Sequence, residues 1–243
     1  MEKKVVKPYN QATSSKKQEV ADMFDNISEK YDFLNHFLSM GIDRIWRKKA
    51  IRILKPSQPK KIIDLATGTG DFALAALKIH PDEVVGVDIS KGMLGKGREK
   101  MKKRKVEDKV TLKYGDSEDL PFEDNTFDAL TVGFGVRNYE NLEKGLAEML
   151  RVISVGGTAV ILEFSKPKRF PIKQFFGFYS KFIIPRLGKS ISKDKAAYAY
   201  LPESVAAFPE GQDFLDILTK VGYREVKAKM VSGGIATIYS GIK

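Results

Sequence analysis

A glycine-containing turn, Asp64-Leu65-Ala66-Thr67-Gly68-Thr69-Gly70-Asp71, follows a short apolar run at 61–63 and precedes an alanine-rich helical pattern at 72–77. An apolar strand that turns through glycines into a helix brings backbone N–H groups close to a ligand. The next apolar run, residues 84–88, ends in Asp88. A carboxylate at the end of a second strand can accept hydrogen bonds from both hydroxyls of a ribose. Together these features predict a site for a nucleoside cofactor.

Two classes of cofactor fit this turn. The spacing of Gly68, Gly70 and Ala73 fits the dinucleotide fingerprint, which is a weak motif when it stands alone. Asp64 favours the other class, because a carboxylate inside the turn would repel a pyrophosphate and would suit the cationic amino group of S-adenosylmethionine. The turn resembles the first motif of the S-adenosylmethionine methyltransferases, D-x-G-x-G-x-G, with Ala66 in place of the first glycine. We therefore predict S-adenosylmethionine as the cofactor and keep a nicotinamide dinucleotide as the alternative.

The composition excludes several other kinds of site. The chain has 243 residues, of which 42% are hydrophobic, enough for one large α/β domain or two small ones. We expect a single domain over residues 1–243. It has no cysteine and two histidines, so we expect no disulfide and no metal site. Its first residues are charged, and no run of 18 apolar residues occurs. The sequence therefore predicts a cytoplasmic protein.

The net charge of +11, from 42 basic and 31 acidic residues, leaves a second class of function open. Such a charge can indicate a nucleic-acid-binding protein. The densest basic cluster, residues 100–105, ends a predicted helix, where cations are favoured by the helix dipole. No aromatic residues are interleaved with it. We interpret the cluster as a solvated helix end and expect no nucleic-acid partner.

Predicted strands alternate with predicted helices along most of the chain, which favours a doubly wound α/β sheet. The expected strands are 61–66, 84–88, 110–115, 127–132, 158–164, 223–230 and 237–242. The expected helices are 22–27, 44–54, 71–79, 90–104, 141–152 and 212–221. Sheets of this kind bind ligands at the carboxyl ends of their strands, so the residues that follow each strand are candidates for the site.

The third and fourth of these strands are followed by further candidates. Asp116 and Ser117 follow the third strand. The resemblance to the S-adenosylmethionine methyltransferases implies that an acid and its neighbour at this place contact the adenine, through the Asp116 carboxylate and the Ser117 backbone N–H. We expect the next residues, Glu118 and Asp119, to be solvated. Arg137 and Asn138 follow the fourth strand and would face the active site.

Two longer patterns resemble one family. Residues 31–46 resemble the first signature of the menaquinone/ubiquinone biosynthesis C-methyltransferases, Y-D-x-M-N-x-x-hydrophobic-S-x-x-x-H-x-x-W. Residues 151–165 resemble the second, R-V-x-K-P-G-G followed by E-x-S. The resemblance runs from about Met23 to the C-terminus. The departures are Leu34 for Met, Asp43 for His, Ser154 for Lys and Gly133 for a frequent Ser.

The resemblance implies the fold and the reaction. The fold would be a Rossmann-like, mostly parallel seven-stranded sheet with an antiparallel last strand, a helical cover over 1–55 and an acceptor-covering insertion at 165–210. The reaction would be the C-methylation of a polyprenyl hydroquinone, demethylmenaquinol, with S-adenosylmethionine and without a metal. The related step of ubiquinone biosynthesis, or another small or lipid-like acceptor, remains open. Residues expected at the cofactor are Asp64, Gly68, Thr69, Gly70, Asp88, Ile89, Asp116 and Ser117.

The residues expected at the acceptor follow from the same chemistry, in which a ring carbon becomes nucleophilic when the adjacent phenol loses its proton. Arg137 would stabilise the phenolate, although an ion pair with a cofactor carboxylate is an alternative. Asn138 could hydrogen-bond a ring oxygen, and Tyr31 could pack on the quinol or relay a proton. His36 could act as a base, whereas His80 is expected to be structural.

An aromatic segment, residues 170–184, suits a lipid substrate. It has apolar residues on one helical face and basic residues around it, as in an interfacial helix, although a helix that covers the sheet has the same pattern. We expect peripheral contact with the inner face of the membrane, and a homodimer is possible.

Overall fold

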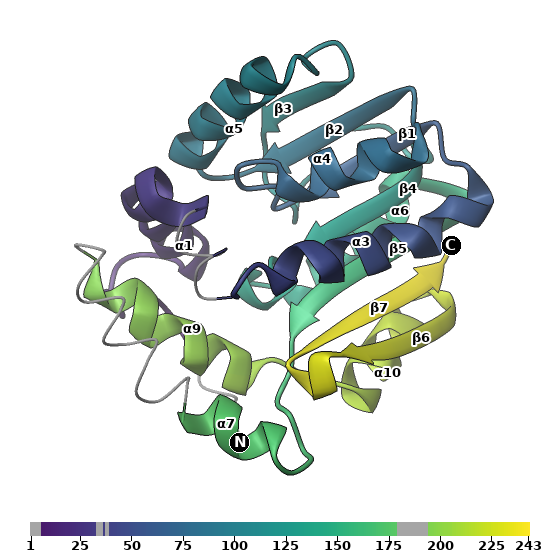
Figure 1. Ribbon diagram of the computed structural model, residues 1–243. Helices are drawn as coiled ribbons and strands as arrows, with labels where there is room; N and C mark the ends of the chain where they lie inside the picture. The colour runs from purple at the N-terminus through teal and green to yellow at the C-terminus, as the bar shows by residue number, and fades with distance from the viewer. Residues whose placement is uncertain (1–5, 33–35, 37–38, 179–193) are drawn as a thin grey trace.

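The computed structural model describes residues 6–32, 36, 39–178 and 194–243. Its strands form a seven-stranded sheet in the order β3-β2-β1-β4-β5-β7-β6, with helices on both faces (Figure 1). The strands are β1 (Lys61–Leu65), β2 (Glu83–Asp88), β3 (Val110–Tyr114), β4 (Phe127–Gly133), β5 (Ile153–Phe164), β6 (Arg224–Val231) and β7 (Ala236–Ile242). The α-helices are α1 (Lys16–Ile27), α3 (Ile42–Leu54), α4 (Asp71–Ala76), α5 (Lys91–Arg104), α6 (Leu142–Val152), α7 (Ile172–Phe178), α9 (Lys195–Ala207) and α10 (Gln212–Val221).

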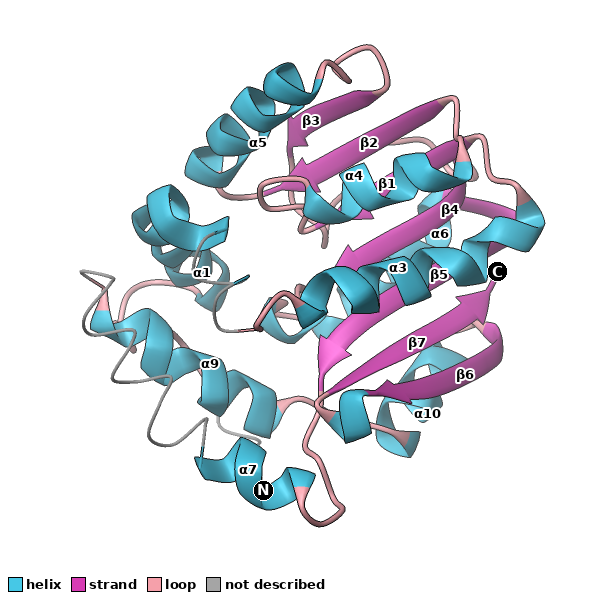
Figure 2. Cartoon of the chain, viewed as in Figure 1, coloured by secondary structure: helices cyan, strands magenta, loops and turns pink. Residues whose placement is uncertain are grey.

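The direction of the strands confirms the predicted doubly wound sheet. Strands β1 to β5 pair in parallel, whereas β7 pairs antiparallel with both β5 and β6. The last strand in the chain is therefore the antiparallel one, as predicted. The carboxyl ends of the parallel strands face α1 and α9 (Figure 2), which places the predicted site at this edge.

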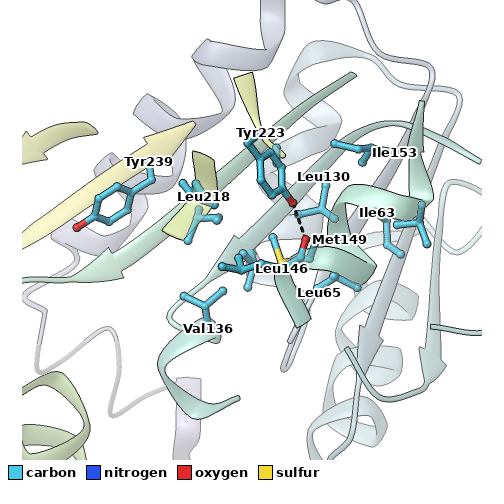
Figure 3. Packing of buried hydrophobic residues seen from close by; sticks show 14 of the residues in the cluster. Ile63, Leu65, Leu130, Val136, Leu146, Met149, Ile153, Leu218, Tyr223 and Tyr239 are labelled. Atoms are coloured by element: carbon cyan, nitrogen blue, oxygen red, sulfur yellow. Dashed lines mark hydrogen bonds between the residues drawn. The ribbon is translucent and has the colours of Figure 1, made fainter. Parts of the chain in front are cut away.

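Two apolar cores, one on each face, follow from the alternation of side chains along the strands. Ile62 packs into the cluster that contains Trp46 of α3, together with residues of α4 and α5. Its neighbour Ile63 packs on the other face, in the cluster that contains Leu146 of α6 and Leu218 of α10. Figure 3 shows this second cluster. Burial on both faces explains why the central strands are almost wholly apolar.

Two element boundaries differ by five residues or more from those predicted. Helix α1 begins at Lys16 instead of Asp22, because the Ser15 side chain caps it by accepting a hydrogen bond from a backbone N–H in its first turn. Strand β5 begins at Ile153 instead of Thr158, so the glycine pair lies within the strand and does not precede it. The pairing of β4 with β5 shifts register there, which accommodates the extra residues.

The region 165–210 contains a helix that the sequence did not predict. Helix α9 is capped by the Asp194 side chain and carries Pro202 in its interior, and an internal proline argues against a helix in sequence-based prediction. Of the helix expected at 170–184, α7 is present, and residues 179–184 lie outside the described part of the chain. Among the described residues, no helix is both long and apolar enough to cross a bilayer.

The N-terminal helices divide between two positions. Helix α1 and the 3-10 turn η1 (Ser28–Lys30) contact α5 near the carboxyl edge of the sheet. Helix α3 packs on the sheet itself, because Trp46, Ala50 and Leu54 form one buried face. The part of the expected cover that lies over the site is therefore residues 6–32, which we call the cover below.

Candidate functional site

One cavity, of about 60 Å³, brings together most of the predicted site residues. It lies between the cover and the loops that follow β1, β2, β3 and β4. Predicted site residues that line it are Tyr31, Gly68, Asp88, Ile89, Asp116, Ser117 and Asn138. The remaining predicted residues, Asp64, Thr69, Gly70 and Arg137, are not among its lining residues.

Asp88 joins the glycine turn to the end of β2. Its Oδ2 accepts a hydrogen bond from the Gly68 N–H at 2.7 Å, and its Oδ1 accepts one from the Ser90 N–H at 2.8 Å. Burial raises the pKa of this carboxyl to about 6, although backbone hydrogen bonds oppose the shift. The carboxylate therefore lies at the wall of the cavity with its orientation fixed, which suits it to accept ribose hydroxyls.

Asp64 has a different position from the one that its motif suggested. It is fully buried, and its two oxygens accept hydrogen bonds from the hydroxyls of Thr67, at 2.6 Å, and Thr131, at 2.7 Å. Burial raises its pKa to about 6, and these hydroxyls oppose the shift. Through these two hydrogen bonds Asp64 holds the turn close to β4. Its contact with the amino group of S-adenosylmethionine stays a prediction.

Thr69 takes part in an ionic network between the turn and the cover. Its hydroxyl donates to Asp32 at 2.5 Å and accepts from the Lys100 ammonium at 2.7 Å. Lys100 also pairs with Asp32 at 2.5 Å and with Asp71 at 2.9 Å. The interpretation of residues 100–105 as a solvated helix end is thus wrong for Lys100, because carboxylates from two other elements surround its ammonium. Contact of Thr69 with the cofactor stays a prediction.

The loop after β3 is held from two sides. Asp116 accepts from the Glu118 N–H at 2.9 Å and pairs with Lys17 of the cover at 2.5 Å. Glu118 was expected to be solvated, but it is 4% exposed. Its carboxylate accepts from the Glu140 N–H at 2.7 Å, which supplies the hydrogen bond that lets the charge be buried.

Arg137 is buried beside a carboxylate that we did not predict as a site residue. Its Nη1 donates to Glu163 at 2.9 Å and also to the Phe134 carbonyl. Glu163 is fully buried, which raises its pKa, and the Arg137 charge opposes that shift. Arg137 therefore has an ion-pair partner within the protein, Glu163, which was not expected, and its contact with a phenolate or a cofactor carboxylate stays a prediction. Its Nε is buried and donates to no group among the described residues.

Asn138, the next residue, lines the cavity. Its Nδ2 lies 3.4 Å from the Phe134 carbonyl, and its Oδ1 accepts from the Tyr200 hydroxyl of α9 at 3.1 Å. Tyr200 is 3% exposed, and burial raises its pKa to about 12. Tyr200 was not predicted at the site because it lies 62 residues from its partner, on a helix that was not predicted.

Two non-glycine residues beside the cavity have left-handed backbone, which is costly for L-residues. Ala66 has φ 47° and Phe134 has φ 59°. Ala66 replaces the first glycine of the motif. This position of the turn therefore keeps the left-handed backbone that favours glycine, although the residue carries a Cβ. The Phe134 ring stacks on Phe164 at 4.3 Å between centroids, which helps to hold it.

The loops after β1 and β4 approach so closely that Gly135 has no room for a side chain. A Cβ there would lie 2.5 Å from the Ala66 Cβ and 3.0 Å from Val132 Cγ2. We expect Gly135→Ala to lower the free energy of unfolding by about 2 kcal/mol, because the loops must separate. Urea denaturation measures this. Gly95→Ala, in the open middle of α5, is the control and should raise stability by up to about 1 kcal/mol. Equal effects of the two substitutions would contradict the close approach.

His36 lies within a group of charged residues. Its Nδ1 is 3.0 Å from Asp43 Oδ2 and its Nε2 is 3.4 Å from Asp71 Oδ2. These three side chains could converge on a metal ion. However, Arg47 pairs with Asp43, and Lys100 pairs with Asp71. Cations of the protein already balance both carboxylates, so we interpret the group as an ionic contact between the N-terminal region and α4.

Comparison with known proteins gives the family. The ubiE/COQ5 methyltransferase family matches residues 12–243. A demethylmenaquinone methyltransferase of Bacteroides fragilis is 50% identical over 239 residues, which cover 98% of this chain and 97% of that protein. The enzyme of the same name from Porphyromonas gingivalis is 42% identical over 240 residues, with 98% of each chain covered. A ubiquinone/menaquinone biosynthesis C-methyltransferase of Geobacter sulfurreducens is 42% identical over 232 residues, covering 95% of this chain and 90% of that one.

Solved structures support the fold. A SAM-dependent methyltransferase of Thermotoga maritima superposes with a TM-score of 0.64 at 20% identity, covering 92% of this chain and 99% of that one. A second, from Methanococcus maripaludis, gives 0.61 at 19% identity, with 90% and 91% covered. These likenesses concern the fold, whereas the match over residues 12–243 and the relatives at 42–50% identity establish the family. The chain belongs to the ubiE/COQ5 methyltransferase family.

Proposed function

We propose that this enzyme transfers a methyl group from S-adenosylmethionine to a ring carbon of demethylmenaquinol. The observation that carries the proposal is that Asp88, Asp116 and Asn138, which were predicted to bind the ribose, the adenine and the acceptor, line one cavity. The names of the relatives from Bacteroides and Porphyromonas support demethylmenaquinol as the acceptor. The double name of the Geobacter relative keeps a ubiquinone precursor as the second candidate.

The residues of the cavity fit this cofactor. When bound, S-adenosylmethionine supplies a methyl group that its positively charged sulfur makes electrophilic. Asp88 would accept the ribose hydroxyls, Asp116 the adenine amine, and the Ser117 N–H would donate to the adenine ring. Gly68, with φ 56°, keeps the backbone of the turn at the cavity wall without a side chain. The carboxylates in the lining would repel a pyrophosphate, which favours this cofactor over a dinucleotide.

The acceptor end needs groups that stabilise negative charge on a ring oxygen. Asn138 offers an amide N–H at the cavity wall, and Arg137 keeps one buried N–H without a partner among the described residues. Arg137 does not line the cavity, so we propose that its charge acts on the ring oxygen from behind the cavity wall, while Asn138 donates directly. Tyr31 lines the cavity from the cover, with its ring edge-on to Phe24 at 5.9 Å, and would pack on the quinol.

The cover must move for the reaction. The cavity of about 60 Å³ is smaller than the roughly 300–1,000 Å³ typical of small-molecule sites. Lys17, Val20, Phe24 and Tyr31 of the cover form part of its wall. We infer that α1 moves outward to admit both substrates, which breaks the pair between Lys17 and Asp116 and frees that carboxylate for the adenine amine.

An exposed aromatic patch on and before α7 suits a membrane-dissolved acceptor. Phe170, Phe175 and Phe178 are 80%, 72% and 58% exposed, and the basic residues Arg169 and Lys173 accompany them. Large exposed apolar groups with basic neighbours are typical of peripheral binding to anionic lipid. We therefore propose that this patch, on and before α7, rests on the membrane surface. Pairing of two copies of the chain stays a prediction.

The patch predicts lipid binding that substitution weakens. We expect Phe175→Ser combined with Phe178→Ser to lower partitioning onto phosphatidylglycerol-containing vesicles about tenfold, because two aromatic side chains no longer enter the interface. Co-sedimentation measures this. Val155→Ser is the control, since Val155 is 78% exposed at the start of β5, away from the patch. The proposal fails if the control lowers partitioning as much as the double variant does.

Binding and acceptor choice test the function. Isothermal titration should show binding of S-adenosylmethionine and none of NAD. With tritiated S-adenosylmethionine under anaerobic reducing conditions, demethylmenaquinol with a short prenyl chain should be methylated faster than a ubiquinone precursor of equal chain length. Tight NAD binding without S-adenosylmethionine binding would overturn the cofactor. A faster reaction with the ubiquinone precursor would favour the second candidate.

A further inference from the structure

Tyr200 lies next to Asn138, which lines the cavity. It belongs to α9, and its side chain packs in a buried cluster with Val20 and Met23 of the cover and Ala197 of its own helix. Only its hydroxyl reaches toward the loop after β4, where it lies 3.1 Å from Asn138 Oδ1. Tyr200 is not among the residues that line the cavity, so it would act through Asn138 and not by contact with a substrate.

The surroundings determine which end of the Asn138 amide faces which partner. The Phe134 carbonyl can only accept a hydrogen bond, so the group 3.4 Å from it must be the Nδ2 donor. The carbonyl end then faces the Tyr200 hydroxyl, which donates to it. Burial raises the pKa of Tyr200 to about 12, so the hydroxyl keeps its proton at neutral pH and remains a donor. The Phe134 carbonyl therefore decides which end of the amide is which, and the hydrogen bond that the Tyr200 hydroxyl donates holds the amide in that orientation.

We propose that Tyr200 is a positioning residue that holds the Asn138 amide with its NH₂ group available to the oxygen of the acceptor ring. An NH₂ group has two hydrogens, and the Phe134 carbonyl takes at most one of them. With the amide reversed, a carbonyl oxygen would face a developing phenolate, and the two would repel each other. The inference rests on the proposed function, because it assigns the second N–H a role only where negative charge develops on a ring oxygen.

The test removes only the hydroxyl. We expect Tyr200→Phe to lower kcat for methyl transfer to demethylmenaquinol about tenfold, with KM for S-adenosylmethionine unchanged within about twofold. Tyr223→Phe is the matched control. Tyr223 is also a buried tyrosine, and its hydroxyl donates to the Leu146 carbonyl at 3.1 Å in the separate core that contains Leu146 and Leu218 (Figure 3). This control should leave kcat unchanged. The melting temperatures of both variants show whether either substitution also lowers stability.

A double-mutant cycle separates positioning from general support of the fold. In an Asn138→Ala background, Tyr200→Phe should have no further effect on kcat, because the amide that it orients is gone. An equal loss of kcat in both backgrounds, or no loss in the native background, would overturn the proposal. If the unaltered enzyme methylates no quinol, the proposed function itself fails, and this result is distinguishable because it is obtained before any variant is made.

Discussion

Asp88→Ala is expected to weaken binding of S-adenosylmethionine about 100-fold. The substitution removes the acceptor for both ribose hydroxyls, and hydrogen bonds to a charged group are worth about 1.5–3 kcal/mol each. It also releases the Gly68 N–H, which the carboxylate holds at 2.7 Å, so the turn loses its fixed position. Isothermal titration of both proteins measures the change.

The matched control is Asp128→Ala. Asp128 also accepts hydrogen bonds from backbone N–H groups, those of Lys60 and Lys61 at 2.8 Å, but at the amino end of β1. It should leave the Kd unchanged. An equal loss of affinity in the two variants would mean that Asp88 acts only through the fold.

The pH dependence of S-adenosylmethionine binding is a second test of the Asp88 carboxylate. Because burial raises the pKa of Asp88 to about 6, the protonated form dominates below that pH. If binding needs the carboxylate, affinity should fall about tenfold for each pH unit below 6. Asp64 has a similar pKa, so the Asp88→Asn variant is needed to assign the effect. The affinity of the Asp88→Asn variant for S-adenosylmethionine should vary little over this pH range. If the variant keeps the pH profile of the native enzyme, the effect belongs to another group.

Arg137→Ala is expected to lower both stability and turnover. Removing one partner of a buried ion pair leaves Glu163 charged without compensation, which costs about 3–5 kcal/mol of unfolding free energy. The pKa of Glu163, already raised by burial, should rise further without Arg137. The loss of stability should therefore grow as pH rises and shrink at acidic pH, where Glu163 is protonated. Urea denaturation at several pH values measures it.

A neutral pair separates the two effects of Arg137. In Arg137→Gln combined with Glu163→Gln, no charge is buried, so much of the lost stability should return. Turnover should stay at least about 100-fold below that of the native enzyme, because a donor and a positive charge near the acceptor are missing. Affinity for S-adenosylmethionine should remain within a few-fold of the native value. Recovery of turnover in the neutral pair would show that Arg137 is only structural.

Local parts of the site could be predicted from the sequence. The turn after β1 and the acid after β2 each lie within a single strand-to-loop transition, and adjacent parallel strands bring their carboxyl ends together. For that reason Gly68, Asp88 and Asp116 line one cavity as expected. The orientation of Asp64 could not be predicted from a local pattern, because one of its two hydroxyl partners, Thr131, belongs to another strand.

Contacts between distant elements could not be predicted. Glu163 lies 26 residues from Arg137, and the register of β4 against β5 brings them together. Tyr200 reaches Asn138 only because α9 packs on α1 through the cluster around Val20. Lys100 lies in a run of basic residues that is typical of a solvated helix end, and only the packing of the cover supplies its partner Asp32. Each of these contacts depends on packing, which no local pattern encodes.

The most direct test of the reaction is to identify its product. The enzyme should be incubated anaerobically with demethylmenaquinol, a reductant and S-adenosylmethionine that carries a trideuterated methyl group, and the quinone then analysed by mass spectrometry and proton NMR. We predict a product that contains the intact labelled methyl group on the ring carbon, formed with the reduced acceptor and not with the oxidised quinone. A label on oxygen, or no transfer to the reduced acceptor by an enzyme that binds S-adenosylmethionine, would contradict the proposed reaction.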